Sequence, residues 1–132
     1  MPLQVPDELH YTRDHEWMRI EGDEAVVGIT EYAATELGDV VFVELPASGT
    51  ALEAAQSFGV IESVKTASDL YSPAAGEIVD VNTQLADKPE LVNDDPYGDG
   101  WMIRIRLADP GSATTSDRII DSAGYRTLIE AG

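Results

Sequence analysis

The sequence contains no cysteine, and this absence excludes several kinds of chemistry at once. Such a chain forms no disulfide bond, has no thiol nucleophile, and binds no zinc ion or iron–sulfur cluster through thiolates. Long apolar runs are absent too, because no stretch approaches the roughly 20 residues of a membrane-spanning helix. The N-terminus has neither the basic segment of a secretory signal nor the arginine-rich composition of a transit peptide. We therefore predict a cytoplasmic protein with no membrane segment, with a mature organellar form as the alternative.

Basic residues are scarce throughout the chain. The 132 residues include 8 Lys or Arg and 25 Asp or Glu, which gives a net charge of −17. Nucleic acid and anionic lipid would repel such a chain, so we expect neither as a partner. Hydrophobic residues make up 43% of the sequence, enough for a core in a single domain of this length. The acidity either attracts partners with basic surfaces or serves solubility alone, and charge by itself favours solubility.

The sequence has two lysines, Lys65 and Lys88. Over residues 20–103 they are the only cations beside 17 acidic residues, a net charge of −15. Strand-forming residues lie before Lys65 at 58–61 and after it at 70–71, with small and polar residues between. This pattern predicts that Lys65 lies near the tip of a hairpin, where an enzyme that acylates amines can reach it. The alternative is that Lys65 is an exposed, solubilising side chain.

Short strands separated by turn residues account for most of the chain. Gly22 and Asp23 separate two strand-like segments, which is a hairpin signal. Thr30 can cap a short helix that ends at Gly38, where a left-handed residue is favoured. Residues 40–43 predict a buried strand. Further strands are expected at residues 50–53, 58–63, 69–72, 77–81 and 101–107, and one helical turn at 89–92.

Two longer patterns bear on the architecture. Residues 46–54 and 73–81 share a Pro-small-small-Gly start at an offset of 27 residues, which predicts two related β units in a sandwich or flattened barrel. Pro-small-small-Gly is also a common turn. The segment 116–130 places apolar residues, Ile119 and Ile120 among them, on an approximate helical stripe. We predict one domain over residues 1–132, with a core at about 11–108 and a C-terminal helical appendage at about 115–131.

The segment around Lys65 resembles a known motif. Residues 62–77 read Glu-Ser-Val-Lys-x-x-Ser-Asp-x-x-Ser-Pro-x-x-Gly-Glu, which is similar to the lipoyl-attachment hairpin of the glycine cleavage system H protein family. The resemblance runs from about Tyr11 to Leu128, nearly the whole chain. Other stretches that resemble the family, in the expected order, are residues 11–17, 27–30, 37–46, 90–98 and 100–101.

This resemblance implies a mainly β protein: a lipoyl/biotinyl-type β sandwich, or flattened barrel-sandwich hybrid, with short helices and a C-terminal helix. It implies a non-catalytic carrier subunit that bears lipoate as N6-lipoyllysine at Lys65. The implied partners are a pyridoxal-phosphate-dependent glycine decarboxylase, a tetrahydrofolate-dependent aminomethyltransferase, dihydrolipoamide dehydrogenase and lipoyl-attachment enzymes. The aminomethyl group of glycine would pass from the decarboxylase to the aminomethyltransferase, and the dehydrogenase would reoxidise the arm. We expect the chain to act as a monomer.

The resemblance also assigns roles to individual residues. Glu62 and Gly76 match positions that attachment enzymes read in lipoyl domains. Glu16 and Asp69 match family positions that hold the amine of the loaded arm in a surface cleft, away from water. Carboxylates suit this task because the amine can be cationic and donate hydrogen bonds. Without the family match, both would be interpreted as solvated surface charges.

Four alternatives share some of these features. A biotin carrier has the same fold, but its lysine is typically flanked by methionines, whereas Lys65 has Val64 and Thr66 as neighbours. A lipoyl domain of a 2-oxo-acid dehydrogenase is usually joined to a longer chain by Ala/Pro-rich linkers, and none occurs here. An H-like protein that relays lipoyl groups to other enzymes is the main alternative. An interaction protein with an unmodified Lys65 is the fourth.

The remaining histidine and aromatic patterns favour structural roles. His15 lies between Asp14 and Glu16, but one histidine with sequence-adjacent acids cannot surround a metal ion, so we predict no metal site. We expect Trp17 and Trp101 to be aromatic residues of the core or its rim. No catalytic triad, phosphate-binding glycine loop or paired catalytic carboxylate is predicted.

Overall fold

The computed structural model describes residues 3–131 and is mainly β, with two packed sheets and four short helices in that range. The strands are β1 (His10–Thr12), β2 (Glu16–Glu21), β3 (Glu24–Ile29), β4 (Val40–Glu44), β5 (Ala51–Leu52), β6 (Ser57–Ser63), β7 (Ala67–Tyr71), β8 (Gly76–Val81), β9 (Ile103–Leu107) and β10 (Ile119–Ile120). The helices are α1 (Glu31–Leu37), α2 (Gln84–Asp87), α3 (Leu91–Asp94) and α4 (Ser122–Ala131). No helix within this range is long and apolar enough to cross a membrane.

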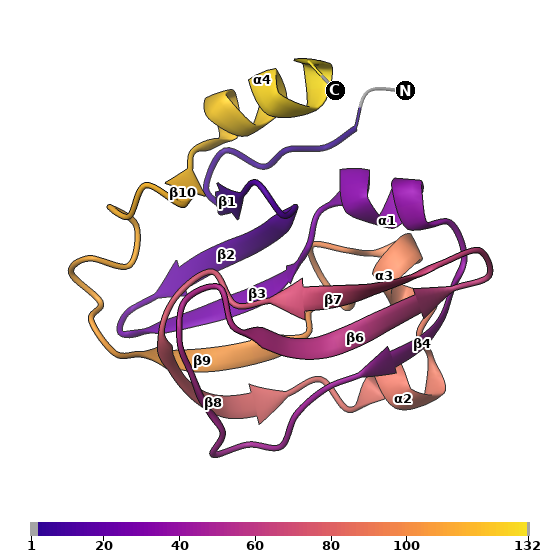
Figure 1. Ribbon diagram of the computed structural model, residues 1–132, viewed down its shortest axis with the longest axis horizontal. Coiled ribbons are helices and arrows are strands. Elements are labelled where there is room, and N and C mark those ends of the chain that lie inside the picture. The colour runs from indigo at the N-terminus through magenta and orange to yellow at the C-terminus, as the bar shows by residue number, and fades with distance from the viewer. Residues whose placement is uncertain (1–2, 132) are drawn as a thin grey trace.

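The two sheets form a sandwich that does not close into a barrel (Figure 1). The larger sheet has the strand order β10-β1-β2-β3-β9-β8-β5, and the smaller has the order β4-β6-β7. Residues 46–54 and 73–81, which share the Pro-small-small-Gly start, meet in the larger sheet. There β5 pairs antiparallel with β8, Ala51 with Glu77 and Leu52 with Gly76. The predicted β sandwich is therefore confirmed, and its two sheets are not closed into a barrel.

Strand β3 of the larger sheet buries side chains on both of its faces. In β3, Val27 points into the main core between the sheets, whereas Val26 points into a second cluster beneath α4. The second cluster centres on Tyr11, Trp17 and Tyr125, and the rings of Tyr11 and Tyr125 stack at 4.7 Å. Because successive strand residues face opposite sides, a strand covered on both faces becomes a continuous apolar run. This explains why residues 25–29 are all buried.

The β2–β3 hairpin forms as predicted, with Gly22 at a φ of 69° in the turn. Its register places Trp17 opposite Gly28. A Cβ atom on Gly28 would lie 2.8 Å from the indole ring, so only glycine leaves room for the fully buried Trp17 side chain. The indole Nε1 donates a hydrogen bond to the Pro96 carbonyl at 2.9 Å. Trp17 is therefore a core residue, as expected.

Both predicted ends of α1 are confirmed. The Thr30 hydroxyl accepts a hydrogen bond from the Ala33 amide at 3.1 Å. Gly38 has a positive φ of 82°, but its ψ is −156°. This combination is open almost only to glycine, and it turns the chain directly from the helix into β4.

Two sequence predictions are wrong in instructive ways. The strand at residues 40–43 is not buried throughout: Val41 and Phe42 are 53% and 47% exposed, because β4 is an edge strand with a bulge between Val40 and Phe42. In the C-terminal segment, Ile119 and Ile120 form a short strand against β1 instead of joining the helix. The helix begins only after Asp121, whose side chain accepts a hydrogen bond from the Gly124 amide at 2.8 Å.

Candidate functional site

Lys65 lies at the tip of the β6–β7 hairpin, as predicted, and its side chain is exposed. Ser63 closes the turn: its amide donates to the Thr66 carbonyl at 2.7 Å. Its hydroxyl accepts from the Lys65 amide at 3.3 Å and from the Thr66 amide at 3.2 Å. These bonds define the backbone of the tip, so the lysine projects from a tight turn and not from a loose loop.

The tip also rests on the connection between α1 and β4. The Val64 amide donates to the Asp39 carbonyl at 3.0 Å. The Lys65 stem passes beside Gly38, where a Cβ atom would lie 3.5 Å from the lysine Cε. The connection is itself held by Asn93 of α3, which donates to the Gly38 carbonyl and accepts from the Val40 amide, both at 2.8 Å.

Sequence reasoning did not identify Asn93 as a support of the lysine. Its only signal was its place in residues 90–98, one of the stretches that resemble the family. A contact between a short helix and a connection 55 residues away has no local pattern in the sequence. The tertiary fold alone reveals this contact.

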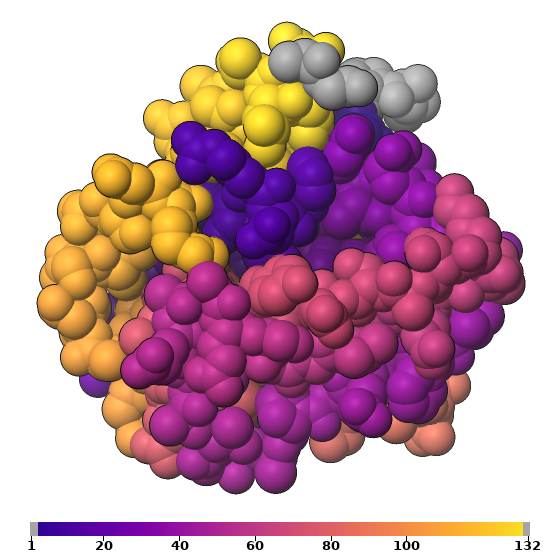
Figure 2. Space-filling view, in the orientation of Figure 1, coloured from indigo at the N-terminus to yellow at the C-terminus, as the bar shows by residue number. Residues whose placement is uncertain are grey.

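A cleft of about 280 Å³ opens on the β7 side of the hairpin, between β7, α1 and the start of β2. In Figure 2 it lies in the hollow between the pink β7 strand and the purple segments above it. The cleft brings together Glu16 and Asp69, the two carboxylates that the resemblance singles out, with Asp14 and Glu36. Among residues 3–131 no lysine or arginine lines it, so the charged side chains that a cationic group would meet in the cleft are carboxylates.

Glu16 is the most unusual of these carboxylates, because only 2% of it is exposed. Burial raises its pKa to about 8, and the nearby charge of Asp14 acts in the same direction. The Thr12 hydroxyl donates to Glu16 Oε1 at 2.7 Å and limits this rise. Near neutral pH the side chain is therefore poised to ionise when a positive charge approaches. Asp69, by contrast, is exposed on β7.

The back of the cleft is held by the C-terminal helix. The Tyr125 hydroxyl of α4 lies 2.8 Å from His15 Nδ1 and 2.7 Å from Thr30 Oγ1. His15 has a positive φ of 71°, and its ring lies 4.9 Å from that of Tyr32. Burial lowers the pKa of the His15 imidazole. His15 thus serves as part of the wall beside Glu16, and no group of three possible metal ligands occurs within residues 3–131.

The comparison with protein families decides the assignment. A family model described as glycine cleavage H-protein matches residues 9–131. The chain belongs to this family. The glycine cleavage system H protein of Magnetococcus marinus is 52% identical over 128 residues, which cover 97% of this chain and 89% of that protein. That of Rubrobacter xylanophilus is 60% identical over 106 residues, covering 80% and 84%.

A solved structure agrees with this membership. The crystal structure of a glycine cleavage system H protein from Mycobacterium marinum superposes with a TM-score of 0.86 at 39% sequence identity. The match covers 96% of this chain and 99% of that one. The fold implied by the resemblance, a sandwich with short helices and a C-terminal helix, is therefore confirmed for this member of the H-protein family.

The other two residues singled out by the family resemblance lie apart from each other. Glu62 is exposed on β6, three residues before Lys65. Gly76 begins β8 in the other sheet, and a Cβ atom there would collide with the carbonyl oxygen of Arg106. Strand β7 ends at Tyr71, which pairs with Ser57 at the end of the hairpin opposite the tip. Gly76 therefore follows the end of the hairpin that is away from Lys65. Close strand packing is a sufficient reason for glycine at position 76 in this H-protein chain.

Proposed function

We propose that this chain is the lipoyl carrier of a glycine cleavage system and bears lipoate as an amide on Lys65. The observation that carries the proposal is the position of Lys65: an exposed amine at a well-defined tip of the hairpin whose second strand, β7, borders a cleft with four carboxylates. Family membership supports the same role. Lys88, the other lysine, follows α2 and lacks such a hairpin.

The described residues suit an attached arm. Lipoate supplies a disulfide on a long flexible arm, and this disulfide accepts the aminomethyl group of glycine. Lys65 anchors the arm, while Asn93 and the α1–β4 connection hold the anchor in place. The partners would be the pyridoxal-phosphate-dependent decarboxylase, the tetrahydrofolate-dependent aminomethyltransferase and dihydrolipoamide dehydrogenase. Tethering keeps the group at a high effective concentration for each docked partner, and the carrier itself contributes no catalytic residue.

Glu16 and Asp69 are proposed to hold the amine of the loaded arm. A cationic amine that enters the cleft favours the ionised form of Glu16 and offsets the cost of its burial. The pair that results is shielded from water, and its charge-assisted hydrogen bonds are stronger than those of neutral groups. Asp69, at the exposed rim, adds a weaker attraction that water screens.

The proposal includes two further points. Glu62 would be read by the attachment enzyme, and its exposure close to Lys65 supports this. The contribution of Gly76 would be indirect, through the close strand packing that it permits. We also propose that the chain folds as one unit, since the stacking of Tyr125 on Tyr11 joins the C-terminal helix to the sheet.

Intact mass spectrometry tests the modification. The wild-type chain, incubated with a lipoate–protein ligase, lipoate and ATP, should gain one lipoyl increment. Lys65→Arg should gain none, and Lys88→Arg, the matched control, should gain the full increment. A wild-type chain that stays unmodified, or a Lys65→Arg variant that is modified, would contradict the carrier proposal.

Reconstitution of glycine cleavage distinguishes a carrier of the aminomethyl group from a protein that only relays lipoyl groups. The lipoylated chain, mixed with the three partner enzymes, should support release of carbon dioxide from glycine in repeated turnovers. A dedicated relay of lipoyl groups would be lipoylated but would not support turnover. That result would replace the carrier role with the H-like alternative.

A further inference from the structure

Large apolar side chains are exposed at three positions in the part of the chain that the structure describes: Val41, Phe42 and Val64, with exposures of 53%, 47% and 69%. All three lie on the hairpin that carries Lys65 or on the strand that pairs with it. Val64 precedes it at the hairpin tip, and β4, which carries the other two, pairs with β6 immediately below the tip. An exposed apolar cluster is unfavourable in water unless another molecule covers it.

A specific backbone feature produces this exposure. Val40 pairs with Ser63 and Phe42 pairs with Glu62, so the extra residue, Val41, forms a bulge in β4. A regular strand would turn one of two consecutive side chains inward. The bulge leaves both Val41 and Phe42 exposed, and such bulges commonly re-aim side chains at the edge of a sheet.

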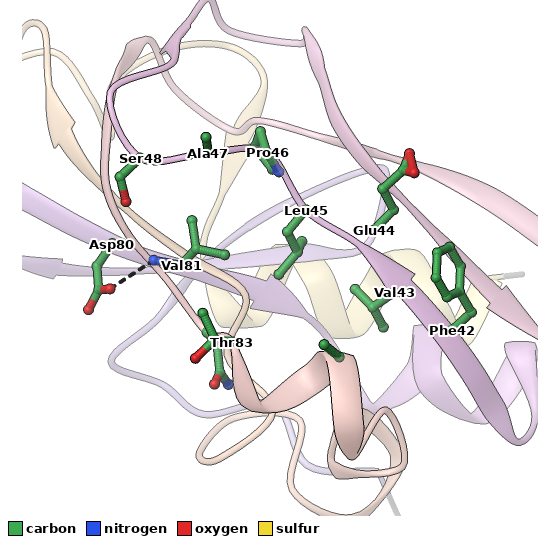
Figure 3. A pocket seen from close by; sticks show the side chains of 12 residues that line it. Phe42, Val43, Glu44, Leu45, Pro46, Ala47, Ser48, Asp80, Val81 and Thr83 are labelled. Atoms are coloured by element: carbon green, nitrogen blue, oxygen red, sulfur yellow. Dashed lines mark hydrogen bonds between the residues drawn. The ribbon is translucent and has the colours of Figure 1, made fainter.

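The apolar cluster continues into a groove. A cavity of about 520 Å³ begins at Phe42. It lies between β4 with the segment that follows it, on one side, and the end of β8 with the segment leading into α2, on the other (Figure 3). Figure 3 shows Leu45 and Val81 reaching toward one another from its two sides. Glu44 and Asp80 supply its charges, and no lysine or arginine of the described part of the chain lines it. An occupant complementary to this groove has an apolar projection with basic residues around it.

We infer that Val41, Phe42, Val64 and this groove form the docking surface for the enzyme that acylates Lys65, an enzyme that holds an activated acyl group. This inference rests on the proposed function. We call the surface the β4 flank, and the side with the carboxylate cleft the β7 flank.

The short distance between the lysine amine and the hairpin tip favours the attachment enzyme over the other partners as the occupant. The attachment enzyme must bring an acyl carbon to an amine on a four-carbon stem, so its surface has to contact the residues around the tip. Partners that act later meet the end of a long arm and need not touch the β4 flank. Attachment from this side also leaves the β7 flank free to receive the arm.

The acylation of Lys65 takes place in two steps. With lipoate and ATP as co-reactants, the ligase forms an acyl-adenylate and releases pyrophosphate. The Lys65 Nζ then forms a bond to the acyl carbon, the bond from that carbon to the phosphate oxygen breaks, and AMP leaves. The ammonium group gives up two of its three protons to solvent, and the neutral amide keeps the third as its N–H. The β4 flank contributes binding alone to this step.

Kinetics of lipoylation test the inference, with purified lipoate–protein ligase, lipoate, ATP and the full apo-chain, and with the modified mass as the readout. Phe42→Ser and Val64→Ser should each raise the KM for the chain by roughly tenfold, with little change in kcat. Val79→Ser, at a half-buried valine in β8, is the matched control and should keep the wild-type KM. Both exposed-site variants should keep the wild-type melting temperature, because neither side chain belongs to the core.

A second measurement shows which partner the surface serves. The same variants, lipoylated to completion by long incubation, should be reduced and reoxidised by dihydrolipoamide dehydrogenase at the wild-type rate. Unchanged KM values for lipoylation would overturn the inference while leaving the carrier proposal intact. An equal defect with the dehydrogenase would also overturn it, since the surface would then be shared. A wild-type chain that is never modified would overturn the proposed function itself.

Discussion

The central strand of the smaller sheet, β6, has β7 on one side and β4 on the other, and the two flanks expose different chemistry. The β7 flank has a cleft of about 280 Å³ with four carboxylates, one of which, Glu16, is almost fully buried. The β4 flank exposes apolar side chains beside a larger groove of about 520 Å³. One hairpin can thus offer its lysine two different environments, separated by the width of a single strand.

The difference follows from how each flank is covered. Helix α1 and the start of β2 lie over the β7 flank, so a carboxylate there is removed from water and its pKa rises. Nothing in the described chain covers the bulge of β4, so its apolar side chains face solvent. A covered polar cleft suits a small charged group, whereas an open apolar surface suits another protein. Four predictions test this contrast, in order of decreasing effect.

Asn93→Ala should disturb both flanks, because Asn93 holds the connection between α1, which covers the β7 flank, and β4. The change removes hydrogen bonds to the Gly38 carbonyl and from the Val40 amide, so we expect a loss of about 2 kcal/mol in the free energy of unfolding. Urea denaturation measures this loss. Gln84→Ala, at an exposed amide in α2, is the control and should change stability by less than about 0.5 kcal/mol. Equal stabilities of the two variants would show that Asn93 is not a support.

Glu16→Gln should affect the β7 flank alone. The amide cannot ionise, so the aminomethyl group should stay on the lipoylated chain for a time shorter by roughly tenfold, since a charge-assisted hydrogen bond is lost. Release of ammonia in the absence of the aminomethyltransferase measures this time. Asp69→Asn should have a smaller effect because Asp69 is exposed. Phe42→Ser should have none, and a comparable loss in that variant would remove the distinction between the flanks.

The pH dependence of stability isolates the burial of Glu16. The pKa of Glu16 is about 8 in the folded chain against an ordinary value of 4.5. The folded state therefore keeps a proton that the unfolded chain releases in this window. The stability contributed by Glu16 is complete below pH 4.5 and declines as pH rises toward 8.

Glu16→Gln cannot titrate, so the stability of the wild type relative to this variant should fall between pH 5 and pH 8. Urea denaturation at several pH values measures the difference. The lowered pKa of His15 acts in the opposite direction, with stability gained as pH rises, but it is common to both chains and cancels. Parallel pH profiles for the two chains would show that Glu16 ionises freely in the fold. Glu62→Gln is the exposed control on β6.

Salt should have the smallest effect, and it should act on the β4 flank. If acidic residues steer the docking of basic partners, the association rate with the ligase should fall a few-fold as ionic strength rises from 0.05 M to about 0.5 M. Stopped-flow fluorescence measures this rate. Glu44→Gln should weaken the salt dependence, whereas Val79→Ser should not. A rate that does not depend on salt would mean that the acidity serves solubility alone.

Several features followed from local sequence. The Gly22-Asp23 turn, the Thr30 cap and the hairpin around Lys65 were all predicted, because each depends on a few adjacent residues. Predictions failed where a distant partner decided the outcome. Ile119 has an apolar pattern that suits a helix, yet it pairs with Thr12 in β1 because that strand offers free backbone groups. The exposure of Phe42 depends on a bulge that no turn residue signals.

The features of the candidate site fall into the same two groups, those set by local sequence and those set by distant contacts. The sequence alone determined that Lys65 is an isolated amine at a hairpin tip, since strand periodicity and turn composition are local properties. It also identified Glu16 and Asp69, but only through the family motif. The tertiary structure decided that Glu16 is buried, that Asn93 and Tyr125 support the site, and that the two flanks differ. Burial and the pKa shift that it causes depend on segments far apart in the chain, and only folding brings these segments together.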